Sequence, residues 1–252
     1  MSVVWLIVII GGAAIFAWQA WPLVSVADWA GLTAILLLLY RQLSKMSPWL
    51  DLTTRKLVLW VANTATQWSL DVRITSDAEC DPEEVLDNLA STLEGRSDFG
   101  PVKLSRESPT KLVARFHRAF VAEVTAGLLS HGSEVTISVL DTHMGYRDSL
   151  TRLRKHLIPF VETVEKHAPS SSGTVSKYAV VVYLGDHNPF YRSVTRDLPT
   201  AKIDQFAINA KLDDADSRLT ISGDQISVVS GSLTRMQEQL ARVFGIGAAV
   251  GD

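Results

Sequence analysis

Two apolar runs at the N-terminus constrain this chain more than any other feature. Between residues 3 and 20 the only clearly polar side chain is Gln19. About 18 residues form roughly 27 Å of α-helix, which is enough to cross the hydrocarbon core of a bilayer. The second run, residues 29–39, is shorter and reaches that length only if it extends toward Arg41 and Lys45, whose long basic side chains can reach the interface. The two runs therefore predict a transmembrane helical hairpin over residues 1–49.

Aromatic and basic residues predict how this hairpin is oriented. Aromatic side chains favour the two interfaces of a bilayer, and basic residues favour the cytoplasmic side. The tryptophans Trp18, Trp21 and Trp29 surround the connecting turn, and Trp5, Tyr40 and Trp49 lie at the opposite ends of the runs. The basic residues Arg41, Lys45, Arg55 and Lys56 all follow the second run, and residues 19–22 carry none. We therefore expect a two-span protein of the cell membrane with both termini in the cytoplasm.

Two other interpretations of the N-terminus are less favoured. A cleavable signal peptide needs a basic region before its apolar stretch, which this sequence lacks. A buried helical hairpin in a soluble protein would place two long apolar helices inside a chain of 252 residues. A core of that size rarely requires helices that are apolar on every side.

Composition limits the partners of the remaining sequence. The formal net charge is −3 and the pI is about 6.1, so nucleic acid is not an expected partner. Cys80 is the only cysteine, which excludes a disulfide within the chain and a cysteine-based metal site. Motifs for a phosphate loop, a dinucleotide fold, a hydrolase nucleophile or a zinc protease are lacking in the sequence. We expect no metal and no cofactor, and we lean against an enzyme.

Hydrophobic periodicity predicts an α+β fold for the part after the hairpin. Alternating apolar residues indicate strands, and apolar residues every three or four positions indicate helices. Predicted helices cover residues 81–93, 146–167 with a kink at Pro159, and 232–244, and a further helix at 50–63 runs along or off the membrane interface. Predicted strands cover residues 66–75, 102–106, 111–118, 121–129, 134–140, 178–184, 203–212, 218–221 and 225–229, and residues 185–200 form a loop.

These elements predict a mainly antiparallel or mixed sheet with about three helices, ferredoxin-like in part around residues 66–118. The Ser-rich stretch at 169–174 is the best internal boundary. It divides the cytoplasmic part into residues 50–168 and 169–252. One domain spanning both is the alternative.

A first candidate ligand site lies in the N-terminal half of the predicted helix at 146–167. Its basic residues Arg147, Arg152 and Lys155 oppose the helix dipole, which favours acidic residues at this end. A bound anion would compensate, and arginine is suited to bidentate contacts with phosphate. The alternative is a solvated face that Asp148 partly neutralises.

A second candidate site is the loop after the predicted strand at 178–184. Its hydrogen-bonding and aromatic residues, His187, Asn188, Tyr191, Arg192 and Arg196, have the composition of a ligand loop on a rigid scaffold. The alternative is a structural turn, since Asn188-Pro189 favours turn initiation. Convergence of the two clusters in space would favour an anionic ligand.

Two functions fit this sequence. The first is a membrane-anchored cytoplasmic sensor that recognises a small anionic ligand, such as a nucleotide, and signals to the hairpin through self-association. The second is a structural subunit of a membrane complex. Expected partners are the lipid bilayer, further copies of the chain or other membrane proteins, and the small ligand. Both functions rest on architecture and not on a chemical motif.

Overall fold

The computed structural model divides the chain into two compact units, Met1–Asp51 and Leu52–Asp252. The residues that the structure describes are 33–34, 37–38, 40, 42, 47–94, 101–116, 120–195, 206–211 and 217–244. The hairpin predicted over residues 1–49 thus lies almost wholly outside them. In the described ranges, none of the helices combines the length and the apolar character that a membrane span needs.

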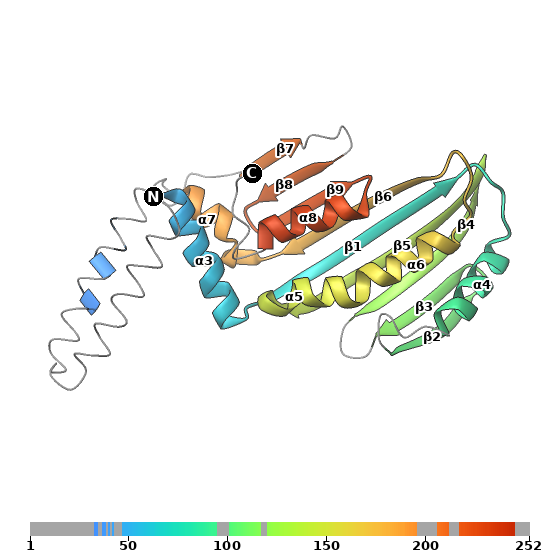
Figure 1. Ribbon diagram of the computed structural model, residues 1–252, viewed down its shortest axis with the longest axis horizontal. Helices are drawn as coiled ribbons and strands as arrows, with labels where there is room; N and C mark the ends of the chain where they lie inside the picture. The colour runs from blue at the N-terminus through green and yellow to red at the C-terminus, as the bar shows by residue number, and fades with distance from the viewer. Residues whose placement is uncertain are drawn as a thin grey trace. The chain divides into compact units, whose positions relative to one another are not determined.

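The second unit is built on one large antiparallel β-sheet, which confirms the predicted α+β class (Figure 1). Nine strands within the described residues pair in the order β2-β3-β4-β5-β1-β6-β9-β8-β7. They are β1 (Ala65–Ser76), β2 (Val102–Ser108), β3 (Lys111–Phe116), β4 (Val121–Leu129), β5 (Gly132–Gly145), β6 (Val175–Tyr183), β7 (Ala207–Lys211), β8 (Arg218–Ser222) and β9 (Gln225–Ser230). Every predicted strand is present.

The described residues form about five helices, more than the three predicted for the sheet domain. They are α3 (Pro48–Ala62), α4 (Pro82–Glu94), a composite helix, α7 (Pro189–Thr195) and α8 (Leu233–Phe244). The composite helix joins α5 (Tyr146–Arg152), a π-helical turn η2 (Leu153–Leu157) and α6 (Ile158–His167). Pro159 lies in the first turn of α6, where a residue without an N–H is tolerated.

The prediction of a loop over residues 185–200 is wrong in part. A short 3₁₀ turn, η3 (Gly185–His187), leads into α7. The carboxamide oxygen of Asn188 accepts hydrogen bonds from the backbone N–H groups of Phe190 (3.0 Å) and Tyr191 (3.4 Å). Asn188 is therefore the N-cap of α7, and Pro189 occupies its first position. The same dipeptide favours a turn, which explains the error.

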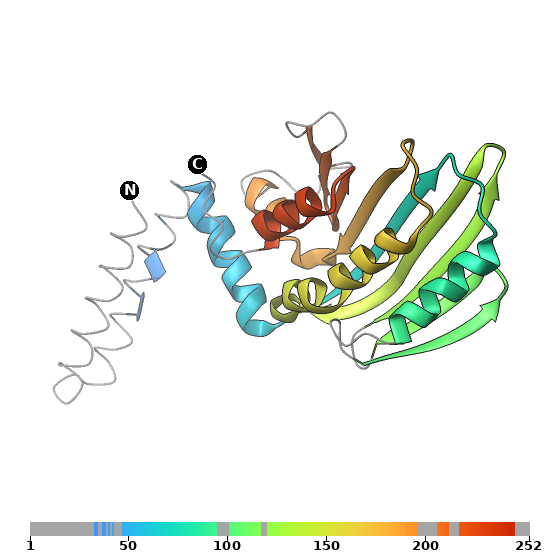
Figure 2. The ribbon, with the colours of Figure 1, turned by 45° about the vertical axis from the view of Figure 1, so that its right-hand side comes forward.

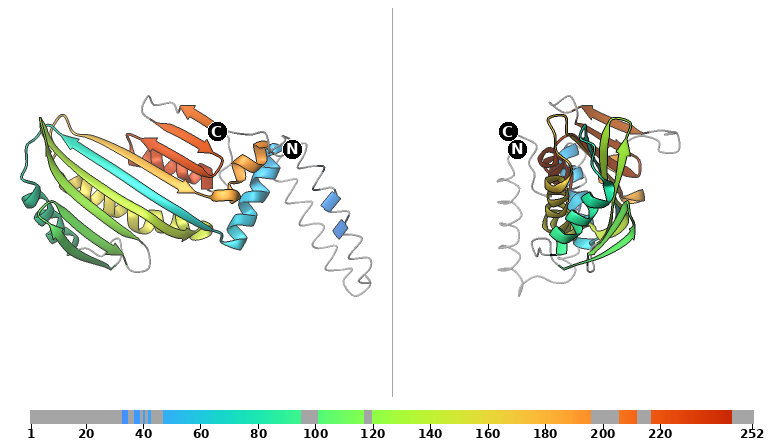
Figure 3. Two further views of the ribbon diagram at one scale, coloured as in Figure 1. Left: turned by 180° about the vertical axis from the view of Figure 1, so that it is seen from behind. Right: turned by 90° about the vertical axis from the view of Figure 1, so that its right-hand side faces the viewer.

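The helices α4, α6 and α8 lie on one face of the sheet, and in the described part of the second unit no helix covers the other face (Figures 2 and 3). In β1, the side chains of Trp68, Leu70, Val72 and Ile74 are buried beneath the helices, and the residues between them are half-buried or exposed. This alternation is the pattern of an antiparallel sheet with one solvated face. We call this uncovered surface the helix-free face.

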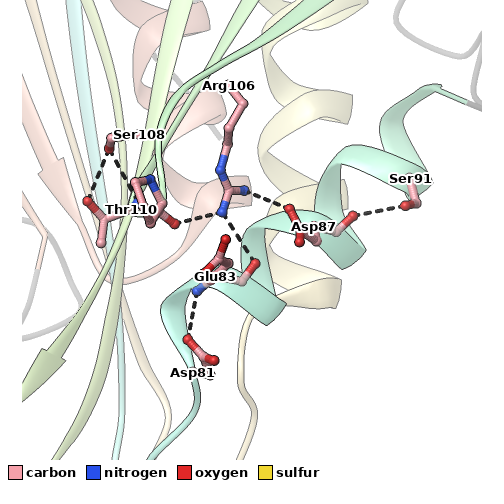
Figure 4. Close-up of polar contacts among 8 residues, drawn as sticks. Asp81, Glu83, Asp87, Ser91, Arg106, Ser108 and Thr110 are labelled. Carbon is pink, nitrogen blue, oxygen red and sulfur yellow. Dashed lines mark hydrogen bonds and ion pairs between the residues drawn. The ribbon is translucent and has the colours of Figure 1, made fainter.

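Arg106 of β2 fixes α4 across the sheet edge (Figure 4). Its guanidinium lies 3.2 Å from the Asp87 carboxylate and donates to the backbone oxygens of Glu83 (3.4 Å) and Pro109 (2.6 Å). Asp81 caps α4, because its carboxylate accepts a hydrogen bond from the Glu83 N–H at 3.0 Å. These contacts hold the helix in place and make no open site.

The two strands that follow β1 in the predicted ferredoxin-like stretch, residues 66–118, are not its neighbours in the sheet. The neighbours of β1 are β5 and β6, and β2 and β3 lie at the edge of the sheet. The chain leaves β5, passes through the composite helix and returns as β6, with β1 between the two strands, which is a split β-α-β connection. Strands from both sides of residues 169–174 therefore belong to one sheet.

Candidate functional site

The predicted loop cluster mainly stabilises its own backbone. Asn188 is fully buried, and its side-chain amide donates to the backbone oxygen of Ser222 at 2.7 Å while its oxygen caps α7. The Nε of Arg192 donates to the backbone oxygen of Asp186 at 2.7 Å. Tyr191 packs edge-on against Phe206 with ring centroids 5.1 Å apart. His187 is exposed, and Arg196 lies outside the described residues.

The predicted helix cluster is divided between different surroundings. Arg147 pairs with Asp148 (Nε to Oδ1, 3.3 Å), and its guanidinium carbon lies 5.8 Å from the centre of the Trp60 ring. Arg152 lines a small apolar void of about 10 Å³ between β1 and the composite helix. Lys155 is exposed. The three cations thus do not gather around one opening.

The two predicted clusters meet the same helix one turn apart. Arg147 contacts Trp60 of α3, and Phe190 of the loop lies beneath Lys56 of α3, with 5.0 Å between the Lys56 Nζ and the ring centre. Residues four apart on a helix share one side. Helix α3 therefore contacts both clusters through one side.

Lys56 is the most unusual ionisable group in this region. Its side chain is almost completely buried, and Nζ donates to the backbone oxygen of Arg242 at 3.2 Å. Burial lowers the pKa of Lys56 from 10.5 to about 8. A cation at the last carbonyls of α8 is favourable for the helix dipole. This role is structural, because Lys56 faces the protein interior.

A separate cleft of about 790 Å³ lies at the end of the sheet where β6 begins. There β6 extends past β9, since Tyr178 is the first β6 residue paired with β9. The cleft is lined by Thr174, Val175, Ser176, Lys177, Lys211, Ser217, Arg218, Val229 and Gly231. Its volume lies within the range of small-molecule sites. We call it the basic cleft.

Three exposed cationic side chains line the basic cleft. Lys177 comes from β6, Lys211 from β7 and Arg218 from β8. Lys211 lies directly opposite Arg218, and Lys177 directly opposite Arg73 of β1. Like charges at directly opposite positions, where Cβ atoms are about 4.5–5.5 Å apart, destabilise a sheet. Within the part of the chain that the structure describes, one of these four cations, Arg73, forms an ion pair, with Asp71 at 3.2 Å.

The hydroxyl groups around the basic cleft already have partners. Ser176 donates to Glu165 at 2.6 Å, Ser217 is bonded to Ser230 at 2.9 Å, and Thr174 accepts from the N–H of Ser171 at 2.8 Å. The lysine and arginine side chains are therefore the groups that can reach a ligand. Three positive charges and no aromatic side chain in the lining favour recognition of anionic groups.

Sequence reasoning did not find the basic cleft. Lys177, Lys211 and Arg218 stand on three strands, and only the pairing of those strands brings them together. One signal was available, because Lys211 and Arg218 flank the short segment 212–216 and a hairpin there would place them opposite each other. That segment contains Asp213, Asp214 and Asp216 and lies outside the described residues.

A comparison with known proteins finds no family model that matches this chain and no curated protein that matches its sequence. Within the described ranges, no three His, Cys, Asp or Glu side chains are placed to hold a metal ion together. The function is therefore argued from the geometry of the sheet unit.

Proposed function

We propose that this chain is a membrane-anchored binding module whose sheet unit recognises a small anionic ligand in the basic cleft. Residues 1–49 would hold the unit at the cell membrane as a two-span hairpin, with both termini in the cytoplasm. Ligand occupancy would be signalled to the hairpin through self-association. Phosphate-bearing compounds, including nucleotides, are the ligand class that these cations fit best.

The observation that carries this proposal is the coincidence of the cations with a cleft. A third like-charged pair, Lys103 opposite Arg115, lies between β2 and β3 and lines no part of the basic cleft. Repulsion between strands is thus not specific to the site. Lys177, Lys211 and Arg218 differ because they surround a volume large enough for a ligand.

The membrane anchor is supported by sequence and by the position of α3. The apolar runs at residues 3–20 and 29–39 have the length and composition of two spans. Helix α3 begins at Pro48, soon after the second run. Its C-terminal half contacts α7 and α8 through Lys56 and α5 through Trp60, and Asn63, directly after the helix, also contacts α5. A movement of α3 would therefore change its contacts with α5, α7 and α8.

The test is a binding measurement on the full chain in lipid nanodiscs. Isothermal titration with pyrophosphate, ATP and GTP should detect at least one ligand. Each charge-assisted contact contributes about 1.5–3 kcal/mol, so Lys177→Ala and Arg218→Ala should each weaken binding by about tenfold or more. Binding should also weaken as salt increases, since the contacts are electrostatic.

The control is the double variant Lys103→Ala, Arg115→Ala, which removes two positive charges from a like-charged pair outside the basic cleft, against one charge in each test variant. It should bind as the unaltered protein does. Equal losses in both sets of variants would mean general electrostatic attraction, and the cleft would not be a site. No binding of any tested anion at millimolar concentration would reject the ligand class.

A structural subunit of a membrane complex is the second candidate function. It is favoured by the helix-free face of the sheet and by the edge strands β2 and β7, each of which pairs on one side only among the strands that the structure describes. Such an edge can accept a further strand. Co-purification of other membrane proteins with the detergent-extracted native chain, in fixed stoichiometry, would favour this function over the sensor.

A further inference from the structure

Helix α3 buries Lys56 and Leu59 and turns three other aliphatic residues outward. The exposed fractions are 44% for Leu57, 60% for Val58 and 66% for Val61, whereas Lys56 is only 7% exposed. A helix on the surface of a globular protein normally shows the opposite pattern, with charged residues outside and aliphatic residues inside. The inverted pattern indicates that water is not the natural surrounding of the outer side.

Contacts on the inner side prevent α3 from turning this surface inward. Lys56 is bonded to the backbone of Arg242 and lies over the Phe190 ring. At the end of α3, the Asn63 side chain accepts from the Arg147 N–H at 3.1 Å and donates to Asp148 at 3.3 Å. The direction of the apolar side is therefore fixed relative to the sheet unit.

The residues beside the apolar side have the composition of a membrane interface. Trp60 is 40% exposed, and Arg147 lies over its ring. Tryptophan favours the headgroup region of a bilayer, and arginine favours anionic headgroups. The sequence before α3 is also basic, with Arg41 and Lys45 between the second apolar run and Pro48. Charge and polarity thus complement an anionic lipid surface.

Chain connectivity makes a bilayer the nearest apolar partner. Helix α3 follows the apolar run 29–39 after only a short segment, so a hairpin in the membrane would keep α3 within reach of the surface. We propose that Leu57, Val58 and Val61 insert into the cytoplasmic interface of the membrane, with α3 lying in its plane and Trp60 at the level of the headgroups. This inference depends on the membrane anchor of the proposed function and adds an attachment of the sheet unit itself.

Such an attachment has a consequence for the sheet unit. An interfacial helix buries its apolar side by about 5–10 Å into the headgroup region. Because Lys56 and Asn63 join α3 to α8 and α5, the unit would be held against the membrane in one orientation. A sheet unit on a free tether would instead sample many orientations.

Spin labels on the full chain in liposomes test this inference. In a Cys80→Ser background, cysteines replace Val58, Val61 or, as a control, Leu128 of β4, which is 62% exposed and lies outside α3. Liposomes contain phosphatidylcholine and phosphatidylglycerol in a ratio of about 3:1, chosen to give the negative surface that basic residues recognise. Collisions with oxygen report lipid, and collisions with a nickel chelate report water.

We expect labels at Val58 and Val61 to collide mainly with oxygen and to be protected from nickel at least severalfold more than the label at Leu128. Equal nickel accessibility at all three positions would overturn the inference. Strong dipolar broadening between labels at Val58 or Val61, unaffected by dilution with lipid, would also overturn it, because a second copy would then cover this side.

A carbonate wash separates this inference from the membrane anchor. If the chain stays in the membrane pellet and its α3 labels report water, the anchor holds and the interfacial helix is wrong. If the chain is released by carbonate, the anchor itself fails and the interfacial helix, which depends on it, fails with it. Retention together with lipid-exposed labels supports both.

Discussion

The ammonium group of Lys56 lies 3.2 Å from the backbone oxygen of Arg242, near the C-terminus of α8. This hydrogen bond joins α3, which follows the predicted hairpin, to the last helix of the sheet unit. The last carbonyls of a helix lack partners within the helix, and a cation there offsets their partial negative charge. Two residues that lie 186 positions apart in the sequence, on either side of the strands of the sheet, are therefore in direct contact.

Lys56 should make the stability of the protein depend on pH above neutrality. Burial lowers its pKa to about 8 in the folded protein, against 10.5 in an unfolded chain. Between these values the unfolded state binds more protons, so the free energy of unfolding should rise with pH through this window. Below about pH 8 the cost of burying the charge is fully present.

The variant Lys56→Met isolates this effect. We expect the difference in the free energy of unfolding, unaltered protein minus variant, to increase by up to about 1.4 kcal/mol per pH unit between pH 8 and 10. Urea unfolding of the full chain in mild detergent at several pH values measures it. A constant difference over that range would mean that the pKa of Lys56 is not lowered.

Asn63 should stabilise two helix ends at once. Its φ is +47°, a conformation that asparagine tolerates at the end of a helix, and its side chain caps α5, whose own N-cap residue Gly145 has none to offer. Asn63→Gly keeps the backbone conformation and removes the cap, so a loss of about 1 kcal/mol is expected. Asn63→Ala disfavours the backbone conformation and also removes the cap, so it should lower the free energy of unfolding by about 2–3 kcal/mol. Equal losses in thermal unfolding would contradict this division.

Removing the hydroxyl group of either of two buried tyrosines should change the stability of the protein, in opposite directions. The Tyr146 hydroxyl is buried and has no hydrogen-bond partner in the described part of the chain, so Tyr146→Phe should raise stability by about 1 kcal/mol. The Tyr178 hydroxyl donates to the Glu165 carboxylate at 2.6 Å, so Tyr178→Phe should lower stability by about 1.5–3 kcal/mol. Chemical denaturation of both variants checks the signs, and a destabilised Tyr146→Phe would indicate a partner for that hydroxyl.

Gly132 should be the least replaceable glycine of the β4–β5 hairpin. Its φ is +116°, and a Cβ atom added there would lie 1.9 Å from the backbone oxygen of Ser76. Gly132→Ala should therefore cost about 2 kcal/mol or more. Gly127 of β4 is the control, since a Cβ added there meets nothing within 4 Å. Similar stability of the two alanine variants, measured by thermal unfolding, would show that the hairpin adjusts.

Much of the secondary structure could be predicted from local patterns. The strand predicted at residues 66–75 is β1, and the helix predicted at residues 81–93 is α4, which begins after its cap Asp81. The failures have local causes as well. Asn188-Pro189 favours both a turn and a helix start, and only the burial of Asn188 against Ser222 selects the helix. Arg192 was predicted to bind a ligand, yet it bonds the backbone of Asp186.

By itself, the sequence determined the apolar N-terminus, the α+β class and most element boundaries, because hydrophobic periodicity and caps act over a few residues. Only the tertiary structure decided that Lys177, Lys211 and Arg218 share a cleft and that α3 presents Val58 and Val61 outward. Strand order and helix orientation arise from contacts between residues far apart in the chain. Local sequence patterns do not predict such contacts, so only the folded structure shows which charged residues lie close together.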